Sequence, residues 1–365
     1  MDDPFSILIA WCRPIPKKAG HYGLYWKTLN ESHAERWLRD IYNQEANRLE
    51  SSMRDHAHYL FMAAVRWLSV HESDDVQRMN PHPVQLAKCA LRKWSPTWFH
   101  GFCLSRWTEI WHMVRNRSVQ ISKLGRNALI APLLGHVATI TNSKIVFIDV
   151  GTSIGFGMLW PYLKFDYGSG QHLIGPFTSN HGSVLKCECN HSMLLRMGRI
   201  LPEPTVTVGI EIEPISYSNY DDVLWCVSMI GPDDTEGFDN FESGLSLLAD
   251  VRPEIVTGCV LNHLSAAIQR QSEDQVLVVN HAMLEHHLTL NGKLGEWRDL
   301  LTEISHSRPF FETGIEWISG ESAERPKPVK VFLNHWKQGQ NTTLIHGYAD
   351  ATAAGTQLKI VEIFT

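Results

Sequence analysis

The sequence lacks an excess of basic residues, and this absence bears on its partners. Its 33 lysines and arginines are outnumbered by 39 aspartates and glutamates, so the 365 residues carry a formal net charge of −6. A protein that neutralises phosphate groups needs a concentration of positive charge. We therefore expect no nucleic acid among its partners.

Long hydrophobic runs are also missing. The longest early run, Phe5 to Cys12, contains Ser6 and stops at Arg13-Pro14. It is too short to span a bilayer, and it lacks the basic start of a secretion signal. We expect no membrane partner and a cytoplasmic location.

Cysteines are few and odd in number. The seven cysteines are scattered through a chain with 44% hydrophobic residues, which can bury a core without disulfides. Only Cys187-Glu188-Cys189-Asn190-His191 crowds residue types that bind metals. A zinc site needs about four ligands, and no second Cys/His pair stands at a suitable spacing. We expect a polar hairpin tip there, no metal, and a reducing compartment.

The first part of the chain has the spacing of helices. Apolar residues recur at helical intervals in four stretches, namely Ser32 to Val70, Val84 to Leu91, Trp107 to Val114 and Leu124 to Ile140. This pattern predicts a helical N-terminal domain over residues 1–140, which we expect to cover the active site.

The spacing of the apolar residues changes at Lys144. Ile145 to Ile148 is a continuous apolar run, as in a strand buried on both faces. Similar runs at 206–212, 254–256 and 276–279 alternate with helical patterns at 220–229 and 238–248. The alternation predicts a doubly wound α/β sheet over residues 141–365. Short runs at 329–333, 343–345 and 358–364 predict antiparallel strands closing its edge.

A glycine-rich turn follows the first predicted strand. Asp149-Val150-Gly151-Thr152-Ser153-Ile154-Gly155 lies between that strand and a helical stretch. Open α/β sheets bind ligands at such a turn, where glycines let the backbone approach and a helix N-terminus offers amide donors. The sequence therefore predicts a nucleotide-type site here, and the alternative is an ordinary tight turn.

Details of the turn discriminate among nucleotides. Ser153 stands where a dinucleotide fingerprint has its second glycine, and the expected acid about 20 residues on is missing. No Lys-Ser or Lys-Thr pair follows the turn, which argues against ATP. An acid followed by Gly-x-Ser-x-Gly is typical of S-adenosylmethionine methyltransferases. We therefore expect S-adenosylmethionine to bind at Asp149, Gly151, Ser153 and Gly155.

Three later strand ends supply further candidates. Glu211 and Glu213 end the second strand and share one face; we favour Glu211 as the ligand of the ribose hydroxyls over an ordinary exposed carboxylate. Cys259 follows the third strand, where we expect it beside the adenine. Asn280 and His281 end the fourth strand and could face the transferred carbon, His281 as a base or orienting donor, or as a structural histidine.

Residues 164–204 are an insertion between the first two strands, and we predict that they form a lid. Aromatic faces suit a sulfonium, and five aromatic residues lie in or near the segments expected to close over the site. They are Trp111, Phe156, Trp160, Tyr162 and Tyr167. Tyr167 is the catalytic candidate because its phenol could hold an amine, and ordinary core packing is the alternative for each residue.

From about Leu124 the chain resembles a bacterial family of uncharacterised proteins with a class I methyltransferase-like Rossmann fold and a helical N-terminal part. The resemblance rests on Leu124-Gly125-Arg126, the turn from Asp149 to Gly155, Phe165-Asp166-Tyr167-Gly168, Gly209 to Pro214, Asp221 to Trp225, and His281. The chain departs from that family at Ser122-Lys123, usually Asn-Glu, and at Asp350 to Gly355, where a His-Pro-His-Gly element is usual. Azetidine-2-carboxylate synthases, which cyclise S-adenosylmethionine, lie in this neighbourhood.

The resemblance implies cyclisation of S-adenosylmethionine to azetidine-2-carboxylic acid and methylthioadenosine. Methyl transfer to a small acceptor would use the same cofactor residues. A third alternative is a catalytically inactive scaffold that docks to a biosynthetic assembly line, but Asp149, Gly151 and Gly155 are intact. We expect a small-molecule substrate and a monomer or homodimer.

Overall fold

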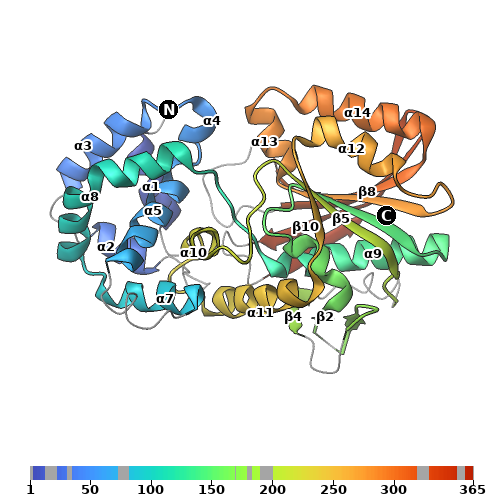
Figure 1. The fold of residues 1–365 in the computed structure, drawn as a ribbon, viewed down its shortest axis with the longest axis horizontal. Helices are drawn as coiled ribbons and strands as arrows, with labels where there is room; N and C mark the ends of the chain where they lie inside the picture. Colours follow the sequence, from blue (N-terminus) through green and yellow to red (C-terminus); the bar gives the residue numbers. More distant parts are fainter. Residues whose placement is uncertain are drawn as a thin grey trace. The chain divides into compact units, whose positions relative to one another are not determined.

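The computed structural model describes nine segments of the chain: residues 3–12, 23–30, 35–72, 82–168, 170–178, 183–189, 200–318, 329–351 and 358–364. The chain divides into two compact units (Figure 1). The helical unit comprises Met1–Ile121 and Ser216–Glu242, and the sheet unit comprises Ser122–Ile215 and Ser243–Thr365.

The helical unit has an aromatic core. Its elements are α1 (Pro4–Cys12), α2 (Gly23–Asn30), α3 (Glu35–Ala46), α4 (Ser51–Arg54), α5 (Ala57–His71), α7 (Pro83–Ala90), η1 (Leu91–Lys93), α8 (Pro96–Asn116), α10 (Tyr220–Ser228) and the start of α11 (Thr235–Val251). The buried ring of Tyr42 lies 5.1 Å from Phe61 and 5.5 Å from Trp111 between ring centres. Buried Arg66 donates from Nη1 to the Ile230 carbonyl at 2.5 Å, which ties α5 to the segment after α10.

The sheet unit contains an 11-stranded sheet in the order β3-β2-β4-β11-β10-β9-β8-β7-β1-β5-β6. The strands are β1 (Ile145–Val150), β2 (Lys164–Asp166), β3 (His172–Ile174), β4 (Val184–Cys189), β5 (Pro204–Glu211), β6 (Glu254–Thr257), β7 (Val276–Ala282), β8 (Phe310–Trp317), β9 (Val329–Lys337), β10 (Gln340–Ala351) and β11 (Leu358–Phe364). Strands β6-β5-β1-β7-β8 pair in parallel. Their order reverses beside β1, as in a doubly wound sheet, so the expected α/β architecture is confirmed.

Helices cover both faces of the parallel half (Figure 1). One face packs on α12 (Val260–Gln269), α13 (Leu284–Leu290) and α14 (Leu294–Ser307). Ile148 and Val279 of the sheet meet Leu264 and Trp297 of these helices in one buried cluster. The other face packs on α9 (Asn127–Thr141), which follows the short η2 (Leu124–Arg126).

The boundary expected at residue 140 differs from the one in the structure. Helix α9 belongs to the sheet unit because its apolar side packs on β8 and β9. The crossover after β5 supplies residues 216–242 to the helical unit, so the division also falls inside α11. The expected split into 1–140 and 141–365 therefore assigns α9 and residues 216–242 to the wrong units.

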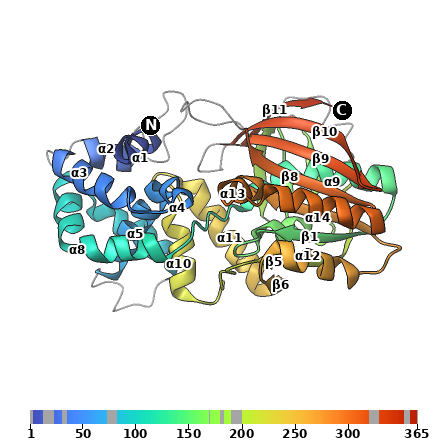
Figure 2. The same cartoon turned by 90° about the horizontal axis from the view of Figure 1, so that it is seen from above.

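The insertion at 164–204 extends the sheet. Its strands β2, β3 and β4 lie beyond β11, to which β4 pairs in parallel through Cys187 to Cys189. Strands β8 to β11 run side by side in antiparallel pairs (Figure 2), and of these β9, β10 and β11 were expected. They do not close the edge, because β3 does. The described part of the insertion is therefore sheet and not the predicted lid.

Candidate functional site

The turn after β1 bends through three residues with positive φ. Gly151 has φ 70°, Ser153 has φ 54° and Gly155 has φ 101°. A Cβ added at Gly151 would meet no atom within 4 Å, so the space above this residue is open. The helical stretch expected after the turn is a 3₁₀ helix, η3 (Phe156–Tyr162). Pro161 lies within η3 and has no amide hydrogen to continue an α-helical ladder.

Glu211 joins the end of β5 to this turn. Its Oε2 accepts the amide of Ser153 at 2.7 Å, and its Oε1 accepts the amides of Ile212 at 2.8 Å and Glu213 at 3.3 Å. The hydroxyl of Ser122 lies 2.7 Å from that of Ser153. These contacts stabilise the left-handed conformation of Ser153, which is uncommon for a residue other than glycine.

Asp149 ends a polar row that crosses three strands. Asp149, Asn280 and Thr313 are in register on β1, β7 and β8. Thr313 donates to Asn280 Oδ1 at 2.8 Å, and Asn280 Nδ2 donates to Asp149 Oδ1 at 2.6 Å. Asn280, which we expected to face the transferred carbon, therefore orients the carboxyl of Asp149.

The carboxyl of Asp149 is 4% exposed. Burial raises its pKa to about 6, although the hydrogen bond from Asn280 opposes the shift. A Cβ added at Gly157 would lie 2.2 Å from Asp149 Oδ2. The missing side chain of Gly157 thus makes room for this carboxyl.

The end of β6, the third predicted strand, is hydrogen-bonded to the end of β5. The amide of Gly258 donates to the carbonyl of Glu211 at 2.8 Å, which brings half-buried Cys259 to the same edge of the sheet. Cys259 is the N-cap residue of α12, and its carbonyl oxygen lies 3.0 Å from His263 Nδ1. The structure therefore brings together the candidates from β1, β5, β6 and β7.

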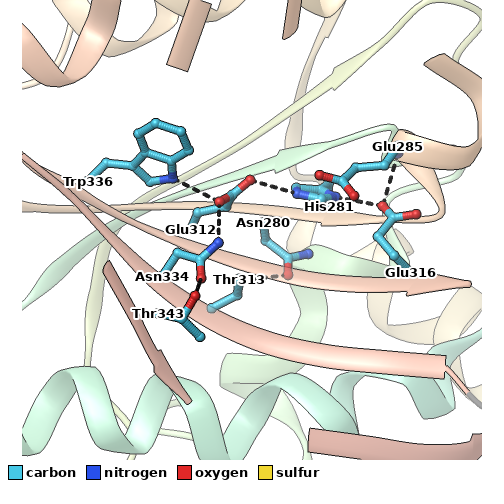
Figure 3. A network of polar contacts seen from close by, with 9 residues as sticks. All are labelled: Asn280, His281, Glu285, Glu312, Thr313, Glu316, Asn334, Trp336 and Thr343. Atoms are coloured by element: carbon cyan, nitrogen blue, oxygen red, sulfur yellow. Dashed lines mark hydrogen bonds and ion pairs between the residues drawn. The ribbon is translucent and has the colours of Figure 1, made fainter. Parts of the chain in front are cut away.

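His281 lies in a buried ionic network and not at an accessible surface (Figure 3). It is 0% exposed, and it donates from Nδ1 to Glu316 at 2.8 Å and from Nε2 to Glu312 at 3.1 Å. Burial alone would lower its pKa, but the two hydrogen-bonded carboxylates raise the pKa to about 10. An imidazolium with both nitrogens occupied cannot accept a proton near neutral pH, so His281 is not the base that we considered.

This pKa predicts how stability depends on pH. Because the pKa of His281 rises from its usual 6.5 to about 10 on folding, its contribution is complete below pH 6.5 and is lost as the pH rises towards 10. We expect the free energy of unfolding to fall over this range in urea titrations. The His281→Gln variant should show a shallower fall, and identical slopes in both proteins would contradict the assignment.

Tyr167 packs in the interior of the sheet unit. Its hydroxyl donates to the Ala128 carbonyl at 2.8 Å, and its ring is 2% exposed. Two other aromatic candidates of this unit are buried: Trp160 lies 5.7 Å from Phe147, and Phe156 packs against Gly244. Half-buried Tyr162 lies 5.5 Å from the exposed ring of Phe177, and Trp111 lies in the core of the helical unit. Except for Tyr162, these positions correspond to the core-packing alternative, and we leave Tyr167 out of the proposed site.

The chain matches the model of a known protein family. A family model described as "Uncharacterized protein conserved in bacteria (DUF2332)" matches residues 26–357. The chain belongs to this family. The match confirms the bacterial, uncharacterised family of the resemblance, and its description names no activity, substrate or relation to azetidine synthases. No curated protein matches the chain.

One solved structure with some similarity is the bifunctional kinase-methyltransferase WbdD. It is 11% identical, with a TM-score of 0.28, and the match covers 60% of this chain and 41% of that chain. The DUF2332 chain therefore spans less than half the length of that protein. Similarity at this level carries no argument about activity.

Sequence reasoning missed the residues that β8 brings to the site of this DUF2332 chain. Phe310–Trp317 was not recognised as a strand, so the roles of Glu312, Thr313 and Glu316 were not anticipated. One signal was available. Glu312 and Glu316 are four residues apart, which places both on one face of a strand, and two acids on a buried face require a buried cation.

Two further findings concern the described residues alone. Among them, no group of three or more His, Cys, Asp or Glu side chains could hold a metal ion. Asn190 and His191, part of the crowded motif, lie outside the described segments, and the seven cysteines, all within them, form no disulfide bond. No described helix has the length and apolar character needed to cross a membrane.

Proposed function

We propose that this chain is an S-adenosylmethionine-dependent enzyme with its cofactor site at the carboxyl ends of β1 and β5. The observation that carries the proposal is the bond between Ser153 N and Glu211 Oε2, 2.7 Å long, which holds the glycine-rich turn and the second-strand acid together. Both elements lie beside the point where the strand order reverses, the usual ligand position in open α/β sheets.

The residues at this edge fit the cofactor. Open space above Gly151 would admit a ligand close to the backbone. Ile212, beside Glu211, is 64% exposed and offers an apolar surface for a purine ring. The carboxylate of Glu211 accepts three amides, of which the bond from Glu213 at 3.3 Å is the longest. A ribose hydroxyl would replace that contact at the least cost.

The remaining groups would prepare the site. The amide of Asn280 holds Asp149 in place beneath the turn, and Gly157 leaves space for its carboxyl. Cys259 would lie beside the base because its strand end is bonded to that of Glu211. Fixed polar groups of this kind orient a ligand without reorganising when it binds.

For the reaction, we propose cyclisation of S-adenosylmethionine to azetidine-2-carboxylic acid, on the strength of the resemblance. The α-amine would attack the γ-carbon, and the C–S electron pair would leave with methylthioadenosine. Methyl transfer to a small acceptor is the second candidate. The position of Tyr167 favours this second reaction, because the phenol expected to hold the amine is bonded to Ala128.

Incubation with S-adenosylmethionine alone distinguishes the two reactions. Cyclisation yields methylthioadenosine without an acceptor, whereas methyl transfer yields S-adenosylhomocysteine only when an acceptor is added. Mass spectrometry of the nucleoside product identifies which bond broke. Calorimetry that detects no binding of S-adenosylmethionine or either nucleoside product at millimolar concentration would exclude both reactions.

Glu211 should be the acid that binds the ribose. We expect Glu211→Ala to weaken the affinity for S-adenosylmethionine by about 2–3 kcal/mol, through loss of hydrogen bonds to a charged group. This corresponds to roughly 30- to 150-fold in the dissociation constant. Calorimetry on Glu211→Ala and on the matched control Glu213→Ala measures the difference. If only Glu213→Ala loses affinity, the role belongs to Glu213.

A further inference from the structure

On one side of His281, both carboxylate oxygens of Glu312 accept hydrogen bonds. Oε2 of Glu312 accepts hydrogen bonds from Asn334 Nδ2 and Trp336 Nε1, both at 2.8 Å. Its Oε1 accepts from His281. Three donors therefore hold Glu312 as a carboxylate, and the pKa of Glu312 is lowered because these bonds and the imidazolium outweigh the effect of burial. Glu312 needs no further partner.

On the other side of His281, one carboxylate oxygen of Glu316 has no hydrogen-bond donor among the described residues. Glu316 is 3% exposed, and its Oε1 accepts from His281 and from the amide of Glu285 at 3.1 Å. Its Oε2 is buried and has no hydrogen-bond partner among the described residues. A buried acceptor without a donor is destabilising, and more so when it is charged. This oxygen therefore calls for a donor that the described part of the chain does not supply.

The charges around Glu316 also indicate that a cation is missing. His281 contributes one positive charge, against the carboxylates of Glu312 and Glu316. Half-buried Glu285 is a third acid beside them, as Figure 3 shows. Lys330 faces Glu316 in the register of β8 and β9; its Nζ lies 4.4 Å from the centre of the Phe332 ring, and its positive charge also acts on Glu285. The three carboxyl groups therefore outnumber the two cations, His281 and Lys330.

We propose that Glu316 and Glu285 form a binding site for an ammonium group of a small-molecule ligand. An ammonium carries three donors, which can satisfy the unpartnered oxygen of Glu316 and reach the carboxylate of Glu285. A metal ion fits less well, because no group of three ligating side chains lies within the described segments. For the reaction that such a ligand enters, the inference rests on the function proposed above.

The position of this site relates it to the cofactor edge. His281 and Asn280 are consecutive on β7, so their side chains point to opposite faces of the sheet. The amide of Asn280 holds Asp149 on one face, while His281 holds Glu316 on the other. The ammonium could belong to S-adenosylmethionine or to a separate amine substrate. Carboxylates favour the protonated amine, so the site recognises an amine and does not activate it as a nucleophile. If that amine belongs to S-adenosylmethionine, the site supports methyl transfer and excludes cyclisation, which needs the unprotonated amine.

Calorimetry with n-propylammonium chloride tests the site in the full-length chain. We expect saturable binding of n-propylammonium and none of n-propanol, which has the same chain length without the charge. Glu316→Gln and Glu285→Gln should each weaken binding at least tenfold, about 1.4 kcal/mol. The exposed Glu296→Gln on α14 is the matched control and should bind as the unmodified chain does. Circular dichroism verifies that each variant is folded.

The outcomes separate this proposal from the cofactor site. Competition between n-propylammonium and S-adenosylmethionine would identify the cofactor as the source of the ammonium, and independent binding would identify a separate amine. Binding of n-propylammonium without any binding of S-adenosylmethionine would sustain this site and exclude the proposed function. Absence of saturable n-propylammonium binding, with or without S-adenosylmethionine, would overturn the site, as would equal affinities in the folded Glu316, Glu285 and Glu296 variants.

Discussion

Replacing His281 by phenylalanine should destabilise the chain by about 3–5 kcal/mol, the typical effect of removing one partner from a buried ion pair. The imidazolium separates Glu312 and Glu316, which are 2% and 3% exposed. Without it, two buried carboxylates would face each other with no cation between them. Urea unfolding followed by tryptophan fluorescence measures the loss, since Trp297 lies 5.8 Å from His281 between ring centres.

A combined variant distinguishes charge from packing. The triple variant His281→Phe, Glu312→Gln, Glu316→Gln removes all three charges and should recover part of the lost stability, because replacing a complete buried ion group by neutral residues is often tolerated. If the triple variant is no more stable than His281→Phe, the loss comes from packing against Trp297 and Phe332, whose ring centres lie 5.8 Å and 5.7 Å from that of His281.

His281 illustrates how far the sequence alone reached. Its place at the end of the fourth parallel strand was predictable, because the apolar run of β7 stops there. Its environment was not, because both carboxylates come from β8, whose polar residues interrupt its apolar pattern. A histidine at a strand end is compatible with catalysis or with a buried ion group, and only the pairing of β7 with β8 distinguishes them.

The sheet edge that carries the proposed cofactor site was more predictable. Parallel strands in a doubly wound sheet end at the same edge, so Asp149, Glu211 and Cys259 were expected near one another. Their hydrogen bonds were not, since the contact of Asn280 with Asp149 depends on a register between strands far apart in the sequence. Local pattern thus locates residues along the edge, and strand pairing decides which of them touch.

The position of Tyr167, in contrast, could not be predicted from the sequence. It follows η3 closely in sequence, which suggested a position over the turn. Strand β2 instead joins the far side of the sheet through β4 and the C-terminal β11. That position depends on a pairing between Cys187 to Cys189 and a strand more than a hundred residues later. No local pattern in the insertion reveals such a partner.

Adding one methyl group at Gly157 should disrupt the sheet edge that carries the proposed cofactor site. In Gly157→Ala the new Cβ would lie 2.2 Å from Asp149 Oδ2, a separation that no unstrained contact allows. Asp149 cannot simply turn away, because Asn280 holds its other oxygen at 2.6 Å and the side chain is buried. We expect a loss of about 1–3 kcal/mol in unfolding free energy, as for other overpacked cores, and at least tenfold weaker binding of S-adenosylmethionine.

The partner of that methyl group can be identified with a double-mutant cycle. Asp149→Ala removes the carboxyl with which the new Cβ would collide, so Gly157→Ala should cost much less stability in that background than in the unmodified chain. Residues in direct contact give such non-additive effects, and independent sites do not. Urea unfolding of the four proteins measures the coupling without reference to any ligand. Additive losses would show that Gly157 does not act through Asp149, and the space beside that carboxyl would then have no part in shaping the turn.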